Sequence, residues 1–192
     1  MSLPVGVLAL QGDFREHLQA FARLGVDATP VRTAAELGRV SGLVIPGGES
    51  TTIGKLARIF DVFEPIQRAI ANGLPTFGTC AGLIMLADEI TGGIDGQETF
   101  GGLDVTVQRN AFGNQLDSFE ADIDVSGIPN PVHAAFIRAP IISEVRTAKV
   151  LASLPDGRIV AVSQGNVLGI SFHPEVTGED SVHELFVREF VK

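Results

Sequence analysis

The sequence contains a single cysteine, Cys80, which lies between two glycines in the segment Gly78-Thr-Cys-Ala-Gly82. A short apolar run precedes this segment and a helix-forming run follows it, so Cys80 is expected at a turn from a strand into a helix. A G-x-nucleophile-x-G turn in that context is a nucleophile elbow, in which the next backbone N–H faces a developing oxyanion. The N-terminal end of the following helix also favours a negatively charged sulfur. A lone cysteine is otherwise usually a small core residue, but the glycines favour a nucleophile.

A cysteine nucleophile needs a base and a group that orients the base. Of the four histidines, only His173 directly follows a buried-type strand, in the segment Gly169-Ile-Ser-Phe-His-Pro-Glu175. The carboxylate of Glu175 lies two residues on and can return to the imidazole, so we predict His173 as the base and Glu175 as its orienting group. A capping histidine and a solvated carboxylate are the alternatives. His17 and His183 fall in predicted helices and are expected to be ordinary surface or partly packed residues.

A third candidate is the glycine-containing segment Pro46-Gly-Gly-Glu-Ser-Thr-Thr52, which also follows an apolar run. Consecutive glycines before a helix can present N–H groups to an anion or a carbonyl oxygen. We therefore expect Gly48 to supply a second oxyanion donor that faces the elbow, and a plain strand-to-helix turn is the alternative. Gly54-Lys55 raises the question of a phosphate-binding Walker loop, but Glu49 and Leu56 stand where that pattern needs glycine and Ser/Thr.

Composition limits the class of protein and of partner. The 192 residues carry 14 Lys and Arg against 23 Asp and Glu, a formal net charge of −9. This balance argues against nucleic acid or a membrane surface as a partner, since either requires a basic surface, whereas small anionic ligands remain possible. One cysteine excludes an internal disulfide, and with four histidines it makes no structural zinc pattern, so no metal is expected.

Neither a membrane span nor a signal peptide is indicated. No apolar run approaches the roughly 20 residues that a span needs. The apolar segment near the N-terminus has no basic residue before Arg15 and ends at Gln11-Gly12-Asp13, unlike a secretory signal. We expect a cytoplasmic protein.

The first half of the chain alternates short apolar runs with helical patterns. The apolar runs predict strands over Val5–Leu10, Asp27–Val31, Gly42–Ile45 and Pro75–Thr79. The helical patterns predict helices over Phe14–Leu24, Thr51–Phe60, Phe63–Asn72 and Ala81–Glu89. Asp13 is a plausible N-cap of the first helix. This alternation favours a mainly parallel sheet with helices on both faces.

The second half changes to short strands separated by turns. They are predicted over Leu103–Gln108, Phe119–Ile123, His133–Ile137, Val150–Leu154, Arg158–Val162 and Val167–Phe172. A helix over Ser181–Val191 follows, and the glycine-rich segment Thr91–Glu98 is expected to be a surface loop. Because no repeat or linker appears, residues 1–192 are expected to form one domain. The predicted fold is α/β, a three-layer and mostly parallel sheet flanked by helices, with antiparallel strands in the second half.

Taken together, Gly78-Thr-Cys-Ala-Gly82, His173-Pro-Glu175 and Pro46-Gly-Gly48 resemble the class I, triad-type glutamine amidotransferases, which implies their flavodoxin-like fold. Within that class the chain resembles the glutaminase subunits of pyridoxal 5′-phosphate synthase over nearly its whole length. The segments that carry this resemblance are Leu10-Gln-Gly12, Arg15-Glu-His17, Pro46–Thr52, Phe77–Ile84, Arg109-Asn-Ala-Phe-Gly113, Asp117-Ser-Phe-Glu120, Phe136-Ile-Arg-Ala-Pro140 and Ser171-Phe-His-Pro-Glu175.

The resemblance implies hydrolysis of L-glutamine to L-glutamate and ammonia, with no cofactor. The ammonia would pass to a partner synthase subunit that makes pyridoxal 5′-phosphate from ribose 5-phosphate and glyceraldehyde 3-phosphate. Cys80 would form a thioester, His173 would carry the proton, and Glu175 would orient the imidazole. The backbone N–H groups of Gly48 and Ala81 would hold the oxyanion. The implied glutamine-binding positions are Gly48, Glu49, Ser50, Arg109, Ile137 and Arg138.

The resemblance also implies that the subunit is weakly active alone and is activated by its synthase partner. A physical route exists in the peptide between Gly47 and Gly48, which can turn because neither residue has a Cβ. If the free subunit keeps this peptide turned away, the transition state lacks one oxyanion donor. Gln11 follows the first strand and is the candidate for a side chain that senses or holds this loop.

Three other functions stay open from the residues. A glutaminase subunit serving another synthase, such as imidazole glycerol phosphate synthase, would share the triad but lack the segments Phe136–Pro140 and Asp117–Glu120. A catalytically idle binding module would not need the intact triad. A self-sufficient cysteine hydrolase, such as a peptidase or deglycase, would need neither glutamine nor a partner.

Overall fold

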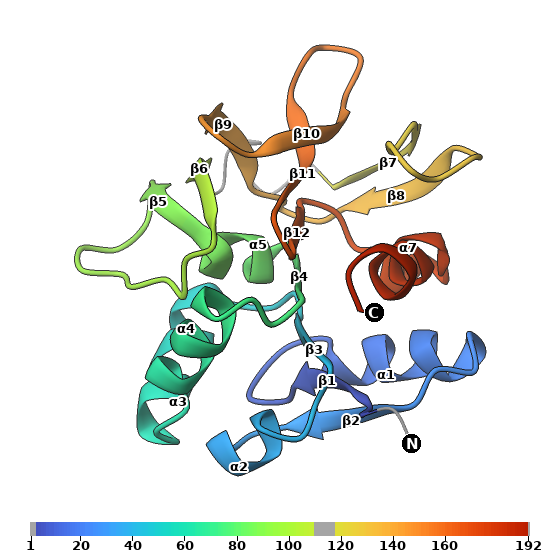
Figure 1. Cartoon of the computed structure of the whole chain (residues 1–192). Coiled ribbons are helices and arrows are strands. Elements are labelled where there is room, and N and C mark those ends of the chain that lie inside the picture. Colours follow the sequence, from blue (N-terminus) through green and yellow to red (C-terminus); the bar gives the residue numbers. More distant parts are fainter. Residues whose placement is uncertain (1–2, 110–117, 192) are drawn as a thin grey trace.

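The computed structural model describes residues 3–109 and 118–191, which form a central sheet flanked by helices (Figure 1). The strands are β1 (Val5–Leu8), β2 (Ala28–Val31), β3 (Gly42–Ile45), β4 (Thr76–Thr79), β5 (Ala87–Thr91), β6 (Leu103–Gln108), β7 (Phe119–Ile123), β8 (Val132–Phe136), β9 (Ile141–Val145), β10 (Lys149–Ser153), β11 (Ile159–Gln164) and β12 (Val167–Ile170). The helices are α1 (Phe14–Arg23), α2 (Ala34–Leu37), α3 (Ser50–Ile59), α4 (Phe63–Ala71), α5 (Ala81–Leu86), α6 (Pro174–Thr177) and α7 (Ser181–Glu189). Of the segments that carry the family resemblance, residues 110–113 and Asp117 lie outside the described residues.

The large sheet changes from parallel to antiparallel along its width. Within the described residues it has ten strands, in the order β2-β1-β3-β4-β12-β11-β9-β6-β5, with β10 paired to β11 beside this path. The strands from β2 to β12 run parallel, whereas β11 is antiparallel to β12 and β9 is antiparallel to β11 and β6. A separate antiparallel pair is formed by β7 and β8. The expected α/β fold, with antiparallel strands in the second half, is confirmed.

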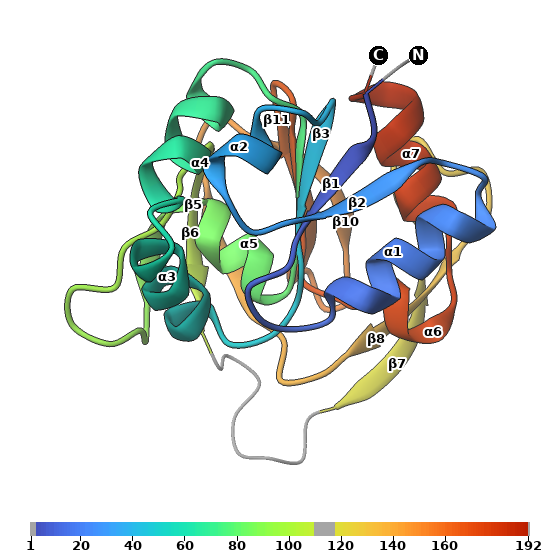
Figure 2. The same ribbon diagram turned by 90° about the horizontal axis from the view of Figure 1, so that it is seen from below.

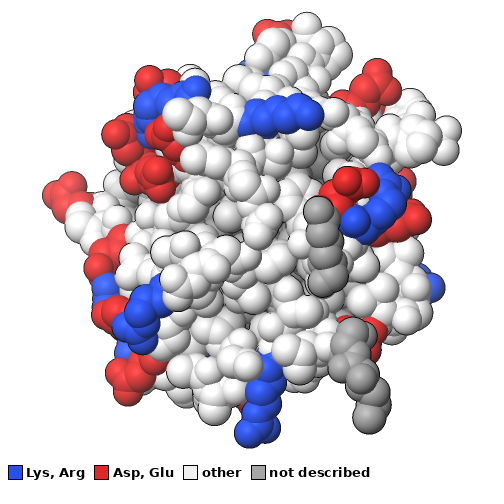
Figure 3. Space-filling model, in the orientation of Figure 1, with Lys and Arg blue, Asp and Glu red and all other residues white. Residues whose placement is uncertain are grey.

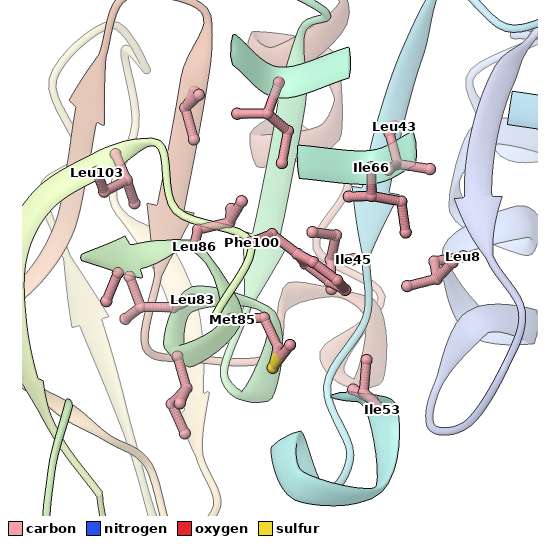
Figure 4. Packing of buried hydrophobic residues seen from close by; sticks show 14 of the residues in the cluster. Leu8, Leu43, Ile45, Ile53, Ile66, Leu83, Met85, Leu86, Phe100 and Leu103 are labelled. Atoms are coloured by element: carbon pink, nitrogen blue, oxygen red, sulfur yellow. The ribbon is translucent and has the colours of Figure 1, made fainter. Parts of the chain in front are cut away.

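Helices cover both faces of the parallel strands, as Figure 2 shows: α1 and α7 lie on one side and α2, α3, α4 and α5 on the other. The alternation of side chains along β3 divides the core accordingly. Leu43 and Ile45 pack with α3, α4 and α5, whereas Val44 packs with Phe21 of α1 and Phe186 of α7. Figure 4 shows the first of these clusters, in which side chains of β3, α3, α4 and α5 meet.

The parallel strands bring four connecting segments to one edge of the sheet. The carboxyl ends of neighbouring parallel strands lie side by side, and this edge is where open α/β sheets bind their ligands. Here the segments after β1, β3, β4 and β12 carry Gln11, Gly48, Cys80 and His173 respectively. Residues as far apart in the chain as Gln11 and His173 are therefore gathered by strand order alone.

The helix predicted over Ala81–Glu89 is wrong at its C-terminal end. α5 ends at Leu86, Ala87 has extended backbone with ψ of 142°, and the chain continues as β5, which pairs with β6. Asp88 and Glu89 are exposed on this edge strand. Pairing at the sheet edge therefore outweighs the helix propensity of these residues.

Three elements have no counterpart among the sequence predictions: β9, α2 and the one-turn helix α6. β9 lies between β11 and β6, but Ser143 and Glu144 are exposed and only Ile142 is fully buried, so its apolar run is too short to recognise. α2 is one turn long and begins with a capping box between Thr33 and Glu36. The sequence contains the signal for this helix, because a capping box requires Thr followed three residues later by Glu.

On the face seen in Figure 3, charged residues of both signs lie mostly around the edge, and uncharged residues cover the centre. Within residues 3–109 and 118–191, no helix has both the length and the apolar character needed to cross a bilayer.

Candidate active site

Cys80 occupies the sharp turn between β4 and α5. It is the N-terminal cap residue of α5, and its φ of 48° and ψ of −101° are strained for a residue other than glycine. The N–H of Cys80 donates to the carbonyl of Ile170 at 2.9 Å, which fixes the turn to the neighbouring strand β12. A Cβ on Gly82 would lie 2.0 Å from the carbonyl oxygen of Ile45, and one on Gly78 would lie 2.6 Å from the carbonyl carbon of Gly82. Both glycines are therefore needed for close packing, and the geometry is that of the predicted elbow.

His173 and Glu175 meet at the start of α6. Nδ1 of His173 lies 2.8 Å from Oε1 of Glu175, and both residues are only 5% exposed. The side chain of Cys80 lines the same cavity as this imidazole, and its interaction with His173 raises the pKa of the histidine. Because Nδ1 faces the carboxylate, Nε2 is the nitrogen left for the sulfur. The structure thus brings the three predicted triad residues together.

The protonation of this series follows from its neighbours. Burial by itself would lower the pKa of His173, but hydrogen bonds and charge interactions with Cys80 and Glu175 raise it to about 10. Burial raises the pKa of the Glu175 carboxyl, and the hydrogen bond with His173 opposes that rise. A buried carboxylate beside the imidazole favours the imidazolium that forms when the thiol gives up its proton.

The loop after β3 lies against His173. A Cβ on Gly47 would stand 2.4 Å from Cε1 of His173, and one on Gly48 would stand 2.5 Å from Oε1 of Gln11. Gly48 also has a φ of 147°. Glycine at these two positions is thus required both for the approach to His173 and for the backbone conformation.

Two hydrogen bonds tie this loop to the segment after β1. The carbonyl of Gly47 accepts from the N–H of Asp13 at 3.1 Å, and the N–H of Glu49 donates to Oε1 of Gln11 at 2.8 Å. Because the carbonyl and N–H of a trans peptide point in opposite directions, the N–H of Gly48 points away from Asp13. Gln11 therefore contacts the loop that it was predicted to contact.

Asp13 has a different role from the one predicted. It occupies the N-cap position of α1, but its side chain makes no capping hydrogen bond. Its Oδ2 instead lies 3.6 Å from Nδ1 of His173. Partial burial raises the pKa of the Asp13 carboxyl, and the positive charge of His173 opposes that rise. The sequence signal was the proximity of Asp13 to the end of β1, at the edge of the sheet where His173 also lies.

Glu49 caps α3 and pairs with Arg109. Its carboxylate accepts hydrogen bonds from the N–H groups of Thr51 and Thr52 and lies 2.9 Å from Nη2 of Arg109. Partial burial would raise the pKa of Glu49, but the hydrogen bonds from Thr51 and Thr52 lower it to about 2. Glu49 is therefore a carboxylate at any pH at which the enzyme is expected to work.

Gln97 joins two predicted site residues and was missed from the sequence. Its Oε1 accepts from Nη1 of Arg109 at 2.6 Å, and its Nε2 donates to Oγ of Ser50 at 2.9 Å. It belongs to the predicted surface loop after β5, where nothing in the local pattern indicated a role in the site. The loop thus contributes one wall of the arrangement around Arg109.

Arg138 lies in the connection between β8 and β9. Its φ of 45° falls in the left-handed region that arginine rarely adopts. Strained backbone of this kind occurs mainly where the surrounding structure needs one side chain in a particular place. Ile137, directly before it, is 40% exposed.

A cavity of about 560 Å³ brings these residues together. Its lining consists of Gln11, Asp13, Gly48, Glu49, Ser50, Cys80, Ala81, Ile84, Arg109, Ile137, Arg138, Pro140, His173 and Val176. All the predicted site residues line it except Gly47, which contacts His173 from the loop, and Glu175, which is buried behind His173. The lining residues that sequence reasoning did not select are Asp13, Ile84, Pro140 and Val176.

His17 and His183 are not surface residues, and the prediction for them is wrong. Both are 0% exposed, and Nδ1 of His17 on α1 lies 2.8 Å from Nε2 of His183 on α7. The sequence held a signal, because His17 stands three residues after Phe14 and four before Phe21, on the apolar face of α1.

One group of potential metal ligands overlaps the triad. Within the described part of the chain, ligand atoms of Asp13, His173 and Glu175 lie within 4.8 Å of one another. Nδ1 of His173 is already hydrogen-bonded to Glu175, and Nε2 is the ring nitrogen left for Cys80. The arrangement is therefore better suited to proton transfer than to metal coordination.

The comparisons with known proteins agree with this geometry. A model of the SNO glutamine amidotransferase family matches residues 7–192. The pyridoxal 5′-phosphate synthase subunit PdxT of Nocardioides sp. is 59% identical over 188 residues, covering 95% of this chain and 94% of that protein. The protein of the same name from Leifsonia xyli subsp. xyli is 58% identical over 185 residues, covering 95% and 93%. A crystal structure described as glutamine amidotransferase superposes with a TM-score of 0.90 at 48% identity, covering 96% of this chain and 97% of that one.

Proposed function

The chain belongs to the SNO glutamine amidotransferase family, and on that premise we propose that it hydrolyses L-glutamine with Cys80, His173 and Glu175 as a catalytic triad. It is the glutaminase subunit of a pyridoxal 5′-phosphate synthase, in keeping with the names of its relatives. The observation that supports the triad most strongly is the buried hydrogen bond of 2.8 Å between His173 and Glu175, on an imidazole that lines the same cavity as Cys80.

In the first half of the reaction, Sγ of Cys80 attacks the side-chain amide carbon of glutamine. The thiol proton moves to His173 and from there to the leaving nitrogen, so that ammonia departs and a glutamyl thioester remains. In the second half, His173 takes a proton from water as the water oxygen attacks the thioester carbon. The C–S bond then breaks, glutamate is released, and the proton on His173 returns to Sγ of Cys80. Glu175 stabilises the imidazolium in both halves.

Two backbone N–H groups would stabilise the tetrahedral intermediates. Ala81 is the first residue of α5, where an N–H has no partner within the helix. Gly48 supplies the second donor from the loop after β3. Removing one such donor typically costs about 10² to 10³ in rate.

Substrate binding is assigned to the residues around the cavity. The α-carboxylate of glutamine requires a cationic partner, and Arg109 and Arg138 supply two. Glu49, which is ionised, suits the α-ammonium group. Gly48, Ser50 and Ile137 complete the set of glutamine-contacting positions.

The orientation of the Gly47–Gly48 peptide offers a way to couple catalysis to docking. Its carbonyl is held by the N–H of Asp13, and the adjoining Glu49 N–H is held by Gln11. Turning the peptide would break the first bond, so docking of the synthase subunit must favour the turned state to compensate. Gln11 would hold the loop while the peptide turns.

The ammonia passes to the synthase subunit, which makes pyridoxal 5′-phosphate from ribose 5-phosphate and glyceraldehyde 3-phosphate. No nucleic acid or membrane partner is part of this proposal. We further propose that residues 1–192 act as one amidotransferase domain and that the protein works in the cytoplasm.

The test is glutamate release from glutamine by the chain alone and with saturating synthase subunit, with Cys80→Ala as the inactive control. The proposal predicts a much higher rate in the complex. Equal rates with and without the partner would remove the switch and favour a self-sufficient hydrolase.

A further inference from the structure

A series of buried polar side chains continues behind the triad, on the side away from the cavity. Nε2 of His17 lies 3.7 Å from Oε1 of Glu175 and 3.2 Å from Oγ1 of Thr79, the residue before Cys80. Nδ1 of His17 lies 2.8 Å from Nε2 of His183. His17, Thr79 and His183 are 0% exposed, as is the side chain of Glu175. A helix–helix contact made only for packing would need none of these polar atoms.

The contacts favour one pair of tautomers. If His183 donates from Nε2 to Nδ1 of His17, then His17 carries its proton on Nε2, where it faces Thr79 and Glu175. The opposite arrangement would aim a nitrogen lone pair of His17 at the Glu175 carboxylate. It would also place a proton on Nδ1 of His183, which is buried and has no hydrogen-bond partner among the described residues. A buried donor without a partner is more costly than an acceptor without one.

Both histidines are neutral at physiological pH. Burial lowers the pKa of His17 well below its usual value, and the neighbouring His183 and His173 lower it further. Burial also lowers the pKa of His183 to about 4, with Asp180 and Arg23 acting in opposite directions. His17 therefore presents a neutral N–H dipole to Glu175, 3.7 Å from Oε1, rather than a second positive charge.

The Glu175 carboxylate has few polar contacts. Its Oε2 has no hydrogen-bond partner among the described residues, and its Oε1 lies 2.8 Å from Nδ1 of His173 and 3.7 Å from Nε2 of His17. A backbone hydrogen bond also lowers the pKa of the Glu175 carboxyl. The charged or titratable groups near it are His173 and His17, with Asp13 adding an unfavourable negative charge. Burial and Asp13 both favour the protonated acid, which could not stabilise an imidazolium.

We propose that His17 is a positioning residue of the active site, which keeps Glu175 ionised and directed at His173 by holding its Nε2–H dipole 3.7 Å from Oε1 of Glu175. The proposal rests on the catalytic role assigned to Glu175 above. Nε2 of the same histidine lies 3.2 Å from Oγ1 of Thr79, so His17 also supports the residue that precedes the nucleophile.

The test compares substitutions at His17 in the complex with the synthase subunit. His17→Leu removes the donor, whereas His17→Gln keeps an N–H near the position of Nε2. The matched control is Phe21→Leu, which changes the buried packing against His183, where the ring centroids lie 5.1 Å apart, without removing a polar group. The readouts are kcat and KM for glutamine as a function of pH.

Without the His17 N–H dipole beside it, Glu175 would take up a proton at higher pH. His17→Leu should lower kcat about tenfold and leave KM within about twofold. The acid limb of the plot of kcat against pH should move up by about one pH unit, which corresponds to a tenfold change in the proton equilibrium of Glu175. His17→Gln should restore most of the rate and return the acid limb, and Phe21→Leu should leave the limb in place. The proposal is overturned if the acid limb of His17→Leu lies at the wild-type pH or at a lower pH. It is also overturned if the acid limb of Phe21→Leu moves up by as much as that of His17→Leu.

A second measurement does not depend on how well the variants fold. In the full chain labelled with ¹⁵N-histidine, NMR should show His17 as the neutral Nε2–H tautomer at neutral pH, and the Nδ1–H tautomer or an imidazolium would overturn the proposal. Glu175→Gln separates this inference from the function on which it rests. If Glu175→Gln is slow but His17→Leu behaves like Phe21→Leu, only the role of His17 fails; if Glu175→Gln is fully active, the triad itself fails.

Discussion

Replacing Glu175 by Gln removes one negative charge from the triad and leaves the shape of the side chain unchanged. The hydrogen bond of 2.8 Å to Nδ1 of His173 is lost as a charge-assisted contact. Hydrogen bonds to charged groups contribute about 1.5–3 kcal/mol, so the protonated imidazole should become less stable by that amount. At about 1.4 kcal/mol per tenfold, kcat should fall about 10- to 150-fold.

The fall should be smaller than that caused by His173→Ala, because glutamine can still accept a hydrogen bond from Nδ1 and hold the imidazole. The pKa of His173 should also fall below its present value of about 10. The amide nitrogen of the new Gln would sit where Oε2 of Glu175 lies, a position without a partner among the described residues. A buried donor left there would lower the free energy of unfolding by about 1–3 kcal/mol.

Glutamate release by the complex, with saturating synthase subunit, measures the first effect, and thermal unfolding of the free chain measures the second. Both are compared with the wild type and with His173→Ala. A kcat for Glu175→Gln within about twofold of wild type would refute the triad assignment, since no charged hydrogen bond of this kind is worth so little.

Three further predictions concern the substrate side of the cavity. Arg109→Ala should raise KM for glutamine about tenfold or more, because a charge-assisted contact to the substrate carboxylate is lost. The alkylation rate of Cys80 should stay constant. An unchanged KM together with an unchanged dependence on the partner would remove Arg109 from the site. Gln11→Ala removes the acceptor of the Glu49 N–H and should reduce the ratio of complexed to free glutaminase rates severalfold, whereas an unaltered ratio would remove Gln11 from the switch. The pKa of Glu49 in the folded chain is about 2, below the ordinary value of the glutamate side chain. The ionised carboxylate therefore stabilises the folded chain at a pH above that ordinary pKa, and this stabilisation is lost as the pH falls toward 2. Glu49→Gln should therefore lower the Tm at pH 7, and the gap from wild type should narrow in acid; a constant gap would contradict the assigned hydrogen bonds.

The parts of the site that could be predicted are those in which the local pattern carries the geometry. The glycines around Cys80 predict a tight turn, because this local pattern does not depend on the rest of the fold. The meeting of Cys80 with His173 could also be expected, because both follow strands of one parallel sheet and such strands end at the same edge.

The parts that could not be predicted depend on partners remote in the sequence. The local sequence around His17 indicates only an ordinary helical residue. The contact with His183 is visible only in the structure, where α1 packs near α7. Gln97 belongs to a polar loop, and its role follows from the approach of Arg109 and of Ser50, which is 47 residues away in the chain. The residues of β5 favour a helix locally, but pairing with β6 draws them into the sheet.

The central claim is that Cys80 forms a covalent bond to glutamine. Its side chain is small and lines the cavity, so Cys80→Ala should preserve the fold and the binding of the synthase subunit. The measurement is glutamate release by the complex that contains Cys80→Ala, with circular dichroism and co-purification of the partner as controls. A loss of about 10³-fold or more is predicted, as for other nucleophiles that act within a triad. A variant that still turns over glutamine within about tenfold of wild type would contradict the assignment of Cys80 as the nucleophile.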